Sequence, residues 1–371
     1  MTAPQPRHIL LTTDAVGGVW TYALDLAAGL LSRGVAVTLA VLGPAPRPGQ
    51  RRAAERIPGL TVVETGLPLD WTAEHPEAVA RAARGVATLA AARGVDLVHL
   101  NTPALAAEAR FAAPVVGGCH SCLASWWSAV RGETSMPEPF RWRTDLLARG
   151  YAGCDRLIAP SYAFMQTTAA VYGALPRAVH NGRASPAIAP RTARNPVVVT
   201  SGRLWDDGKN VRTLDRAAGR MRGQVHAAGA LQGPNGQAVD FEHLLCLNQL
   251  DATQLAALLE RSAVFASLSL YEPFGLGVLE AAQAGCALVL SDIPTFRELW
   301  QGAAVFVAAD DEAAAAEALD ALLDEPQRAA ELGQAAKIRS AQFTADAMVE
   351  GTLAVYGEAL AARAPYAEAA A

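Results

Sequence analysis

The chain has 371 residues, of which 51% are hydrophobic, and its formal net charge is −5. This length exceeds what one hydrophobic core usually covers, so we expect two domains, and the apolar content excludes an intrinsically disordered chain. The charge gives no argument for a nucleic-acid partner. Because there is no apolar run of about 18 residues and no signal-peptide core, we expect a soluble cytoplasmic protein, with peripheral membrane contact left open.

The chain opens with a short apolar run of β character at residues 8–13 (HILLTT). A loop with two glycines, Gly17 and Gly18, follows, and a helical pattern continues to about residue 32. Strand, glycine loop and helix form the typical start of a doubly wound α/β domain. Glycines without a Cβ let the backbone approach a ligand closely and make a positive φ inexpensive, with a plain tight turn as the alternative.

Further β-like runs alternate with helical stretches, such as residues 76–92, through the first half. These runs cover residues 35–42, 95–100 and 114–118. The alternation predicts a mostly parallel sheet, and such sheets bind ligands beyond the carboxyl ends of their strands. Asn101 and His120 follow two of the runs directly, so we expect their side chains at this edge. A histidine with a purely structural role is the alternative.

Two features after this point have open interpretations. Trp126 and Trp127 form either the wall of an acceptor site, because aromatic faces stack on sugars and rings, or a packed core pair. Cys119 and Cys122 have the C-x-x-C spacing of redox motifs, but a thioredoxin context and a second pair for zinc are missing. Five cysteines scattered through the chain predict reduced thiols.

The first half ends with a predicted strand at residues 156–160 and a helix at 161–172. Residues 183–196 (RASPAIAPRTARNP) contain three prolines and little periodicity, which marks the domain boundary. We therefore expect a first domain at residues 1–182 and a second at 197–343.

The second domain restarts with a strand at residues 197–201 and a loop in which Arg203 and Lys209 flank glycine-containing sequence. Two cations beside a helix start suit a diphosphate, and a surface turn with two solvated cations is the alternative. The loop is not a Walker A motif, because five residues separate its glycines rather than four and Asn210 replaces the magnesium-binding hydroxyl.

The rest of the second half alternates in the same way. Strands are predicted at residues 224–229, 264–267 and 287–291, a helix at 252–261, and an alanine-rich helical tail at 311–364. The pattern again predicts a parallel sheet.

Residues 269–300 (SLYEPFGLGVLEAAQAGCALVLSDIPTFRELW) carry the densest set of constraints. Pro273 keeps Glu272 in extended or loop backbone, and a helix is predicted to start near Leu276, with Glu280 about one turn in. Two carboxylates would then flank a helix N-terminus, which favours anions. A nucleotide sugar would place its diphosphate there and its hydroxyls on the carboxylates. A capped helix with two solvated glutamates is the alternative.

The segment YEPFGLGVLEA, followed by GCALVLSDIPTFREL, resembles the donor-site signature of retaining glycosyltransferases of family 4. These have the GT-B fold, which consists of two Rossmann-like doubly wound α/β domains facing a central cleft. The resemblance implies that the final helix, about residues 344–363 of a returning segment 344–371, crosses back onto the first domain. It implies that Glu272 contacts the transferred sugar and Glu280 the ribose. The donor segment would also include Phe274, Gly275, Leu276 and Gly277, with backbone N–H groups near the distal phosphate.

The same resemblance implies roles for residues elsewhere in the chain. These are Gly17 and Gly18 between donor phosphate and acceptor, His120 near the transferred sugar, Arg203 and Lys209 at the phosphates, and Asn248 near the base. The residues themselves, rather than the resemblance, make Asn101, Trp126 and Trp127 candidates for the acceptor side.

The predicted function is therefore retaining transfer of a sugar from a nucleoside-diphosphate sugar to an acceptor hydroxyl. No D-x-D triplet occurs, so we expect a metal-independent front-face reaction with no cofactor besides the nucleotide sugar. The base, the sugar, the acceptor (saccharide, lipid-linked or small molecule) and the oligomeric state stay open. A GT-B epimerase, a phosphorylase and a non-catalytic nucleotide-sugar-binding protein are the alternatives. A nicotinamide oxidoreductase would require a G-x-G-x-x-G loop, which neither glycine loop supplies.

Overall fold

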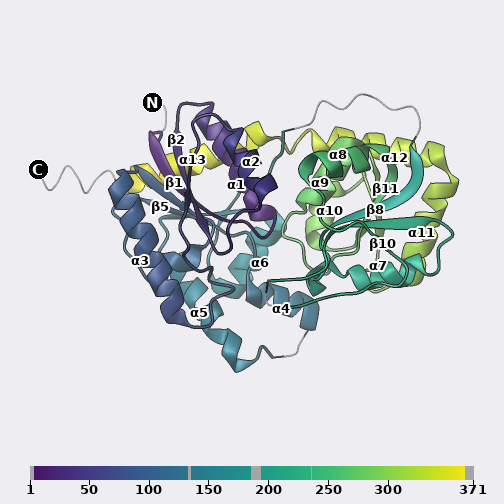
Figure 1. The fold of residues 1–371 in the computed structure, drawn as a ribbon, viewed down its shortest axis with the longest axis horizontal. Coiled ribbons are helices and arrows are strands. Elements are labelled where there is room, and N and C mark those ends of the chain that lie inside the picture. The colour runs from purple at the N-terminus through teal and green to yellow at the C-terminus, as the bar shows by residue number, and fades with distance from the viewer. Residues whose placement is uncertain (1–3, 133–134, 185–193, 235, 364–371) are drawn as a thin grey trace, which may run out of the picture. The chain divides into compact units, whose positions relative to one another are not determined.

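The computed structural model describes residues 4–132, 135–184, 194–234 and 236–363 (Figure 1). The chain divides into two compact units. Unit 1 consists of the residues up to Gly182 together with the segment from Ala345, and unit 2 of Arg183–Thr344. Most of the segment that we expect to link the domains, residues 185–193, lies outside the described residues.

Unit 1 is built on one parallel sheet, whose strand order in the described residues is β3-β2-β1-β4-β5-β6-β7. Its strands are β1 (His8–Asp14), β2 (Ala36–Leu42), β3 (Thr61–Glu64), β4 (Leu97–Leu100), β5 (Val115–Gly118), β6 (Arg156–Ala159) and β7 (Arg177–Ala178). Its helices are α1 (Gly18–Leu31), α2 (Pro48–Glu55), α3 (Pro76–Arg93), the 3₁₀ helix η1 (Pro103–Ala107), α4 (Leu123–Arg131), α5 (Glu138–Ala152), α6 (Tyr162–Tyr172) and α13 (Ala345–Arg363).

The centre of this sheet is buried on both faces, as its uninterrupted apolar runs predict. Residues Ile9–Thr13 of β1 are all buried, and β1 pairs in parallel with both β2 and β4. The chain runs outward from β1 to β3 and then restarts at β4. The strand order thus reverses between β1 and β4, which is where open parallel sheets bind ligands.

Helix α13 returns to unit 1 and packs on α1, β5 and β6, which confirms the predicted crossing of the terminal helix. The contact with α1 is close, because a Cβ on Gly29 would lie 2.4 Å from Cγ2 of Val349. Tyr356 is fully buried, and its hydroxyl lies 2.7 Å from Nδ1 of His99 on β4. The C-terminal segment thus completes the core of the N-terminal unit.

Unit 2 holds a second parallel sheet, with the order β10-β9-β8-β11-β12-β13 in its described residues. Its strands are β8 (Asn195–Arg203), β9 (Gln224–Ala230), β10 (Leu245–Cys246), β11 (Ser262–Ser267), β12 (Ala287–Ser291) and β13 (Val305–Val307). Its helices are η2 (Asp207–Lys209), α7 (Val211–Ala218), α8 (Ala252–Arg261), α9 (Leu276–Ala284), α10 (Pro294–Trp300), α11 (Glu312–Asp324) and α12 (Pro326–Ser340). Here the order reverses between β8 and β11. Both units confirm the predicted α/β fold class.

None of the helices in the described residues is both long enough and apolar enough to span a membrane.

Candidate functional site

Helix α9 begins at Leu276, as predicted, and its start depends on a glycine. Gly275 precedes it with φ at 93°, a conformation that L side chains rarely adopt. No side chain caps this N-terminus, so its first N–H groups lack the partner that a capping oxygen would supply. Val278, Leu279 and Ala282 are buried in the unit 2 core and fix the helix in place. The amide-rich end lies at the carboxyl edge of the sheet.

Lys209 and Glu272 form an ion pair beside this helix start, although 63 positions separate them in sequence. Their side chains are only 20% and 13% exposed. The two loops are also joined through the backbone, because the N–H groups of Leu270 and Tyr271 donate to the carbonyl of Gly208 at 2.9 and 3.2 Å. The loop after β8 and the loop after β11 are therefore joined to each other at the point where the strand order of unit 2 reverses.

Arg203 ends β8, and the same loop holds its guanidinium. Its Nη2 and Nε donate to Oδ2 of Asp206 at 2.7 and 3.2 Å, and the guanidinium lies 5.8 Å from the Trp205 ring centroid. Oδ1 of Asp206 accepts from the N–H of Gly208 at 2.9 Å. One nearly buried carboxylate thus orients Arg203 and also shapes the turn before Lys209. Our reading of the sequence missed Asp206.

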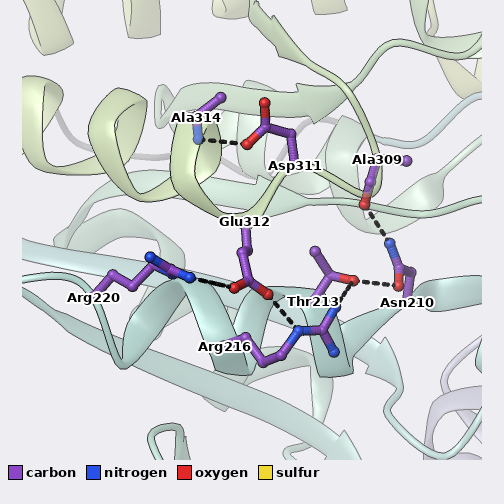
Figure 2. Close-up of polar contacts among 8 residues, drawn as sticks. All are labelled: Asn210, Thr213, Arg216, Arg220, Ala309, Asp311, Glu312 and Ala314. Atoms are coloured by element: carbon purple, nitrogen blue, oxygen red, sulfur yellow. Dashed lines mark hydrogen bonds and ion pairs between the residues drawn. The ribbon is translucent and has the colours of Figure 1, made fainter.

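Asn210 ties this loop to two other parts of unit 2, and Figure 2 shows its contact with one of them, at Ala309. Its Nδ2 donates to the carbonyls of Leu268 at 2.9 Å and Ala309 at 2.7 Å, and its Oδ1 accepts from Thr213 at 2.8 Å. Its φ of 53° lies in the left-handed region. The network continues from Thr213 through Arg216 to Glu312 at the start of α11. These hydrogen bonds therefore fix Asn210, the residue after Lys209, relative to the ends of β11 and β13.

We expect the variants Asn210→Gly and Asn210→Ala to separate the two contributions of this asparagine. Both lose the three hydrogen bonds, but glycine accepts a positive φ, whereas alanine costs about 1–2 kcal/mol more there. Thermal unfolding should show a lower Tm for both variants, with alanine the lower. A donor titration should show weaker binding for both. Wild-type donor affinity in both variants would contradict a positioning role for Asn210.

Glu280 also forms an ion pair, with Arg183, whose role our reading of the sequence missed. The Glu280 and Arg183 side chains are 24% and 21% exposed. Burial raises the pKa of Glu280, and the positive charge of Arg183 opposes that shift. The backbone of Arg183 is held too, because its N–H donates to the carbonyl of Phe343 at 3.2 Å. The side chain of each glutamate in the signature is thus mostly buried and paired with a cation. The alternative of two solvated glutamates is therefore wrong.

The other predicted donor residues differ in what they expose. Phe274 is buried and its ring packs edge-on against Phe343 with centroids 5.8 Å apart, so only its backbone could meet a ligand. A Cβ on Gly277 would lie 3.0 Å from Oγ of Ser201, which explains the glycine by close packing. Asn248 has φ at 56°, and its carbonyl accepts from the N–H of Gly229 at 2.8 Å. It therefore follows β10 at the same edge of the sheet.

In unit 1 the structure brings Asn101 and His120 together. Oδ1 of Asn101 lies 2.7 Å from Nε2 of His120, and the ring of Tyr22 stands edge-on to the imidazole with centroids 4.5 Å apart. Gly17 has φ at −145°, and neither Gly17 nor Gly18 has a positive φ. Neither glycine therefore uses the positive φ that a missing Cβ makes inexpensive. The loop turns because Oδ1 of Asp14 accepts from the N–H groups of Val16 and Gly17.

Trp126 and Trp127 lie on α4 and are both partly exposed, so they are not a buried core pair. Their ring centroids are 6.3 Å apart, Trp127 continues to Phe140 at 6.4 Å, and the Arg131 guanidinium lies 5.5 Å from the Trp126 ring. This arrangement is an aromatic surface with a cation at one end. An acceptor role for it stays a prediction.

The two cysteines of the C-x-x-C motif are packed inside unit 1, and one of them caps a helix. Cys119 and Cys122 are both buried and form no disulfide with each other. Sγ of Cys122 accepts from the N–H of Ser125 and so caps helix α4. Burial raises the pKa of Cys119 far above its ordinary value, which opposes thiolate chemistry. Within the described residues, no group of three or more His, Cys, Asp or Glu side chains is arranged to hold a metal ion.

Two family models match the chain. The model described as Glycosyltransferase Family 4 matches residues 16–183, and the model described as Glycosyl transferases group 1 matches residues 241–339. Glycogen synthase of Mycobacterium tuberculosis is 38% identical over 113 residues, which are 30% of this chain and 27% of that protein, so the match spans about a quarter of that relative. Alpha-maltose-1-phosphate synthase of the same organism is 29% identical over 328 residues, covering 70% of this chain and 83% of that protein.

Solved structures show the same fold at low sequence identity. Sucrose-phosphate synthase from Thermosynechococcus elongatus has a TM-score of 0.81 at 20% identity, covering 96% of this chain and all of that one (100%). Anabaena HepE in complex with UDP-glucose has a TM-score of 0.68 at 19% identity, covering 94% of this chain and 98% of that one.

Proposed function

The chain belongs to the GT-B glycosyltransferases, with a family 4 domain in its first half and a group 1 domain in its second, and from this membership we propose that it transfers a hexosyl group from a nucleoside-diphosphate sugar to an acceptor hydroxyl. Unit 2 binds the donor in this proposal, and unit 1 carries the acceptor-side residues. The GT-B epimerase, the phosphorylase and the non-catalytic binding protein are the alternatives that the test below must exclude.

One observation carries the proposal. The Lys209–Glu272 pair lies beside the uncapped N-terminus of α9, at the point where the strand order of unit 2 reverses. An ammonium group and unpaired backbone N–H groups suit a diphosphate, and a carboxylate suits the hydroxyls of a sugar. In this proposal Glu280, one turn along α9 and paired with Arg183 through Oε1, accepts from ribose hydroxyls.

The proposed chemistry is metal-independent and retains the anomeric configuration. The bond from the anomeric carbon to the donor phosphate oxygen breaks, the acceptor oxygen bonds to the same face, and the acceptor proton passes to the departing phosphate. Negative charge grows on the diphosphate in the transition state. Arg203, Lys209 and the α9 N-terminus would stabilise it more there than in the ground state, which is what accelerates a reaction. In this proposal Glu272 binds the sugar and does not act as a nucleophile.

The relatives suggest where to begin with substrates. HepE was crystallised with UDP-glucose, and two of the similar proteins are named as synthases of sugar phosphates. We therefore propose a nucleoside-diphosphate hexose as donor, and hexose phosphates as the first acceptors to examine alongside lipid-linked and other hydroxyl acceptors.

The test is a panel of nucleotide sugars in thermal unfolding, followed by turnover with EDTA. A correct donor at 100 times its Kd should raise the stability by about 2.7 kcal/mol. With that donor, nucleotide release should depend on an added acceptor, which separates transfer from epimerisation. Turnover at saturating donor should persist in EDTA. Acceptor-independent conversion, or a trapped glycosyl adduct on Glu272, would contradict the proposed reaction.

A further inference from the structure

A row of polar side chains crosses the carboxyl edge of the unit 1 sheet, from the end of β1 to the residues after β4 and β5. Nδ2 of Asn101 donates to the backbone carbonyl of Thr12 at 2.7 Å. On the other side of the same amide, Oδ1 lies 2.7 Å from Nε2 of His120. The backbone N–H of Asn101 also donates to Oγ1 of Thr12 at 2.9 Å, so the asparagine is held at three points.

These contacts determine where the proton of His120 lies. A backbone carbonyl can only accept, so the group that faces Thr12 must be the NH₂ of Asn101. The carbonyl oxygen of the amide then faces His120, and it can only accept as well. Nε2 must therefore carry the hydrogen, and in a neutral imidazole Nδ1 then has the lone pair. The network assigns the tautomer without reference to any ligand.

The surroundings of the imidazole support this geometry. A Cβ on residue 118 would lie 2.7 Å from Nε2 of His120 and 2.9 Å from Oδ1 of Asn101, so Gly118 leaves the space that the contact needs. Tyr22 holds the ring from its side. Within the described residues the contact of His120 with Asn101 engages Nε2 and not Nδ1, and the His120 side chain is only partly buried.

His120 and three titratable side chains near it, His99, Tyr22 and Tyr356, are neutral near pH 7. Burial lowers the pKa of His120 to about 4 and that of His99, its neighbour on β4, to about 3. Tyr22 on α1 faces the imidazole, and Tyr356 on α13 lies behind His99. Burial raises the pKa of each tyrosine above its usual range. No charge from these elements favours an imidazolium ion.

We propose that Asn101 is a positioning residue that holds His120 as the neutral Nε2–H tautomer, so that Nδ1 accepts the hydrogen of a substrate hydroxyl. The identity of that hydroxyl rests on the proposed function, but the tautomer does not. Asn101 then acts through His120, and its amide is already engaged by Thr12 and His120. His120 serves as a hydrogen-bond acceptor that stays uncharged.

The tautomer can be measured on the full-length protein with ¹⁵N-labelled histidine. The sequence has seven histidines, and comparison with His120→Gln assigns the signal of interest. Long-range ¹H–¹⁵N spectra should show His120 neutral and protonated on Nε2 from pH 8 down to about pH 5. An Nδ1–H form, or an imidazolium at pH 7, would overturn the proposal. This measurement does not depend on turnover. An inactive protein would therefore refute the proposed function and leave the assignment of the tautomer standing.

Three variants test the positioning role. Asn101→Ala should produce mixed tautomers and lower kcat/KM about tenfold, by loss of one orienting hydrogen bond. Asn101→Asp places a carboxylate against Nε2–H and should raise the pKa of His120 by about 1–3 units, which moves the acid limb of kcat/KM upward. Gly118→Ala keeps both polar groups but displaces them and should also release the tautomer.

The matched control is Thr12→Val, which removes only the hydrogen bond to the Asn101 backbone N–H. It should lower stability without changing the His120 tautomer or the acid limb. An unchanged tautomer in Asn101→Ala, or acid limbs that coincide in the Ala and Asp variants, would show that Asn101 is merely structural.

Discussion

Replacing Lys209 with methionine is expected to lower kcat about 100- to 1,000-fold, because the variant removes the ammonium that would stabilise charge on the departing diphosphate. The loss should fall on kcat more than on the affinity for donor, since the charge grows in the transition state. Steady-state kinetics with the donor identified by thermal unfolding measure both. Arginine at this position should restore only part of the rate, because its planar guanidinium cannot take the place of a compact ammonium paired with Glu272.

The composition of the chain offers an unusually clean control for Lys209. Of its 31 basic residues only two are lysines, and the other is Lys337 on α12. Lys337→Met should leave kcat within about twofold of wild type, as expected for a surface substitution away from the site. Reductive ¹³C-methylation labels these two lysines and the N-terminus, and a nucleotide should shift the Lys209 signal. A Lys209→Met enzyme with nearly wild-type kcat would refute the proposed charge stabilisation.

The strands buried on both faces could be predicted from the sequence, because continuous apolar runs such as those of β1 and β12 have few other structural interpretations. The missed elements have weaker patterns. Strand β3 is mostly exposed, and α2 is a short polar helix. Helix α5 contains Gly150, which sequence propensity counts against a helix, yet a Cβ there would lie 2.3 Å from the carbonyl of Pro103. Helix α5 is therefore explained by close packing against Pro103 and not by the helix propensity of its residues.

The candidate site was predictable where one segment carried the pattern, as for Glu272 and the helix that starts at Leu276. The pairings were not predictable, because they join positions far apart in sequence. Arg183 reaches Glu280 across 97 positions, and no local periodicity indicates such a contact. The role of Asp206 could have been predicted from local sequence, because an aspartate before a glycine turn often accepts a hydrogen bond from the backbone N–H two residues on. That rule, applied to the loop after β8, would have identified the residue that orients Arg203.

Replacing Gly229 with alanine should be the most damaging single methyl group that can be added near the donor loops. A Cβ at this position would lie 1.9 Å from the carbonyl oxygen of Gly202 and 3.0 Å from Cγ of Leu204. Gly229 and Gly202 are direct partners in the β8–β9 pairing, so the clash is with backbone that cannot rotate away. Overpacking of this kind costs about 1–3 kcal/mol, occasionally more.

The clash at Gly229 should also reach the site, because Gly202 directly precedes Arg203 and any relief moves the end of β8. We expect a Tm lower by about 3–10 °C together with weaker donor binding, measured by thermal unfolding and titration on the same sample. Gly49→Ala is the control. Gly49 lies in helix α2, where alanine favours the helix, and the nearest atom to its added Cβ would be Nη2 of Arg52, in ordinary contact at 3.9 Å. If Gly229→Ala kept both the Tm and the donor affinity of the control, the close approach of β8 and β9 would not be what holds Arg203 in place.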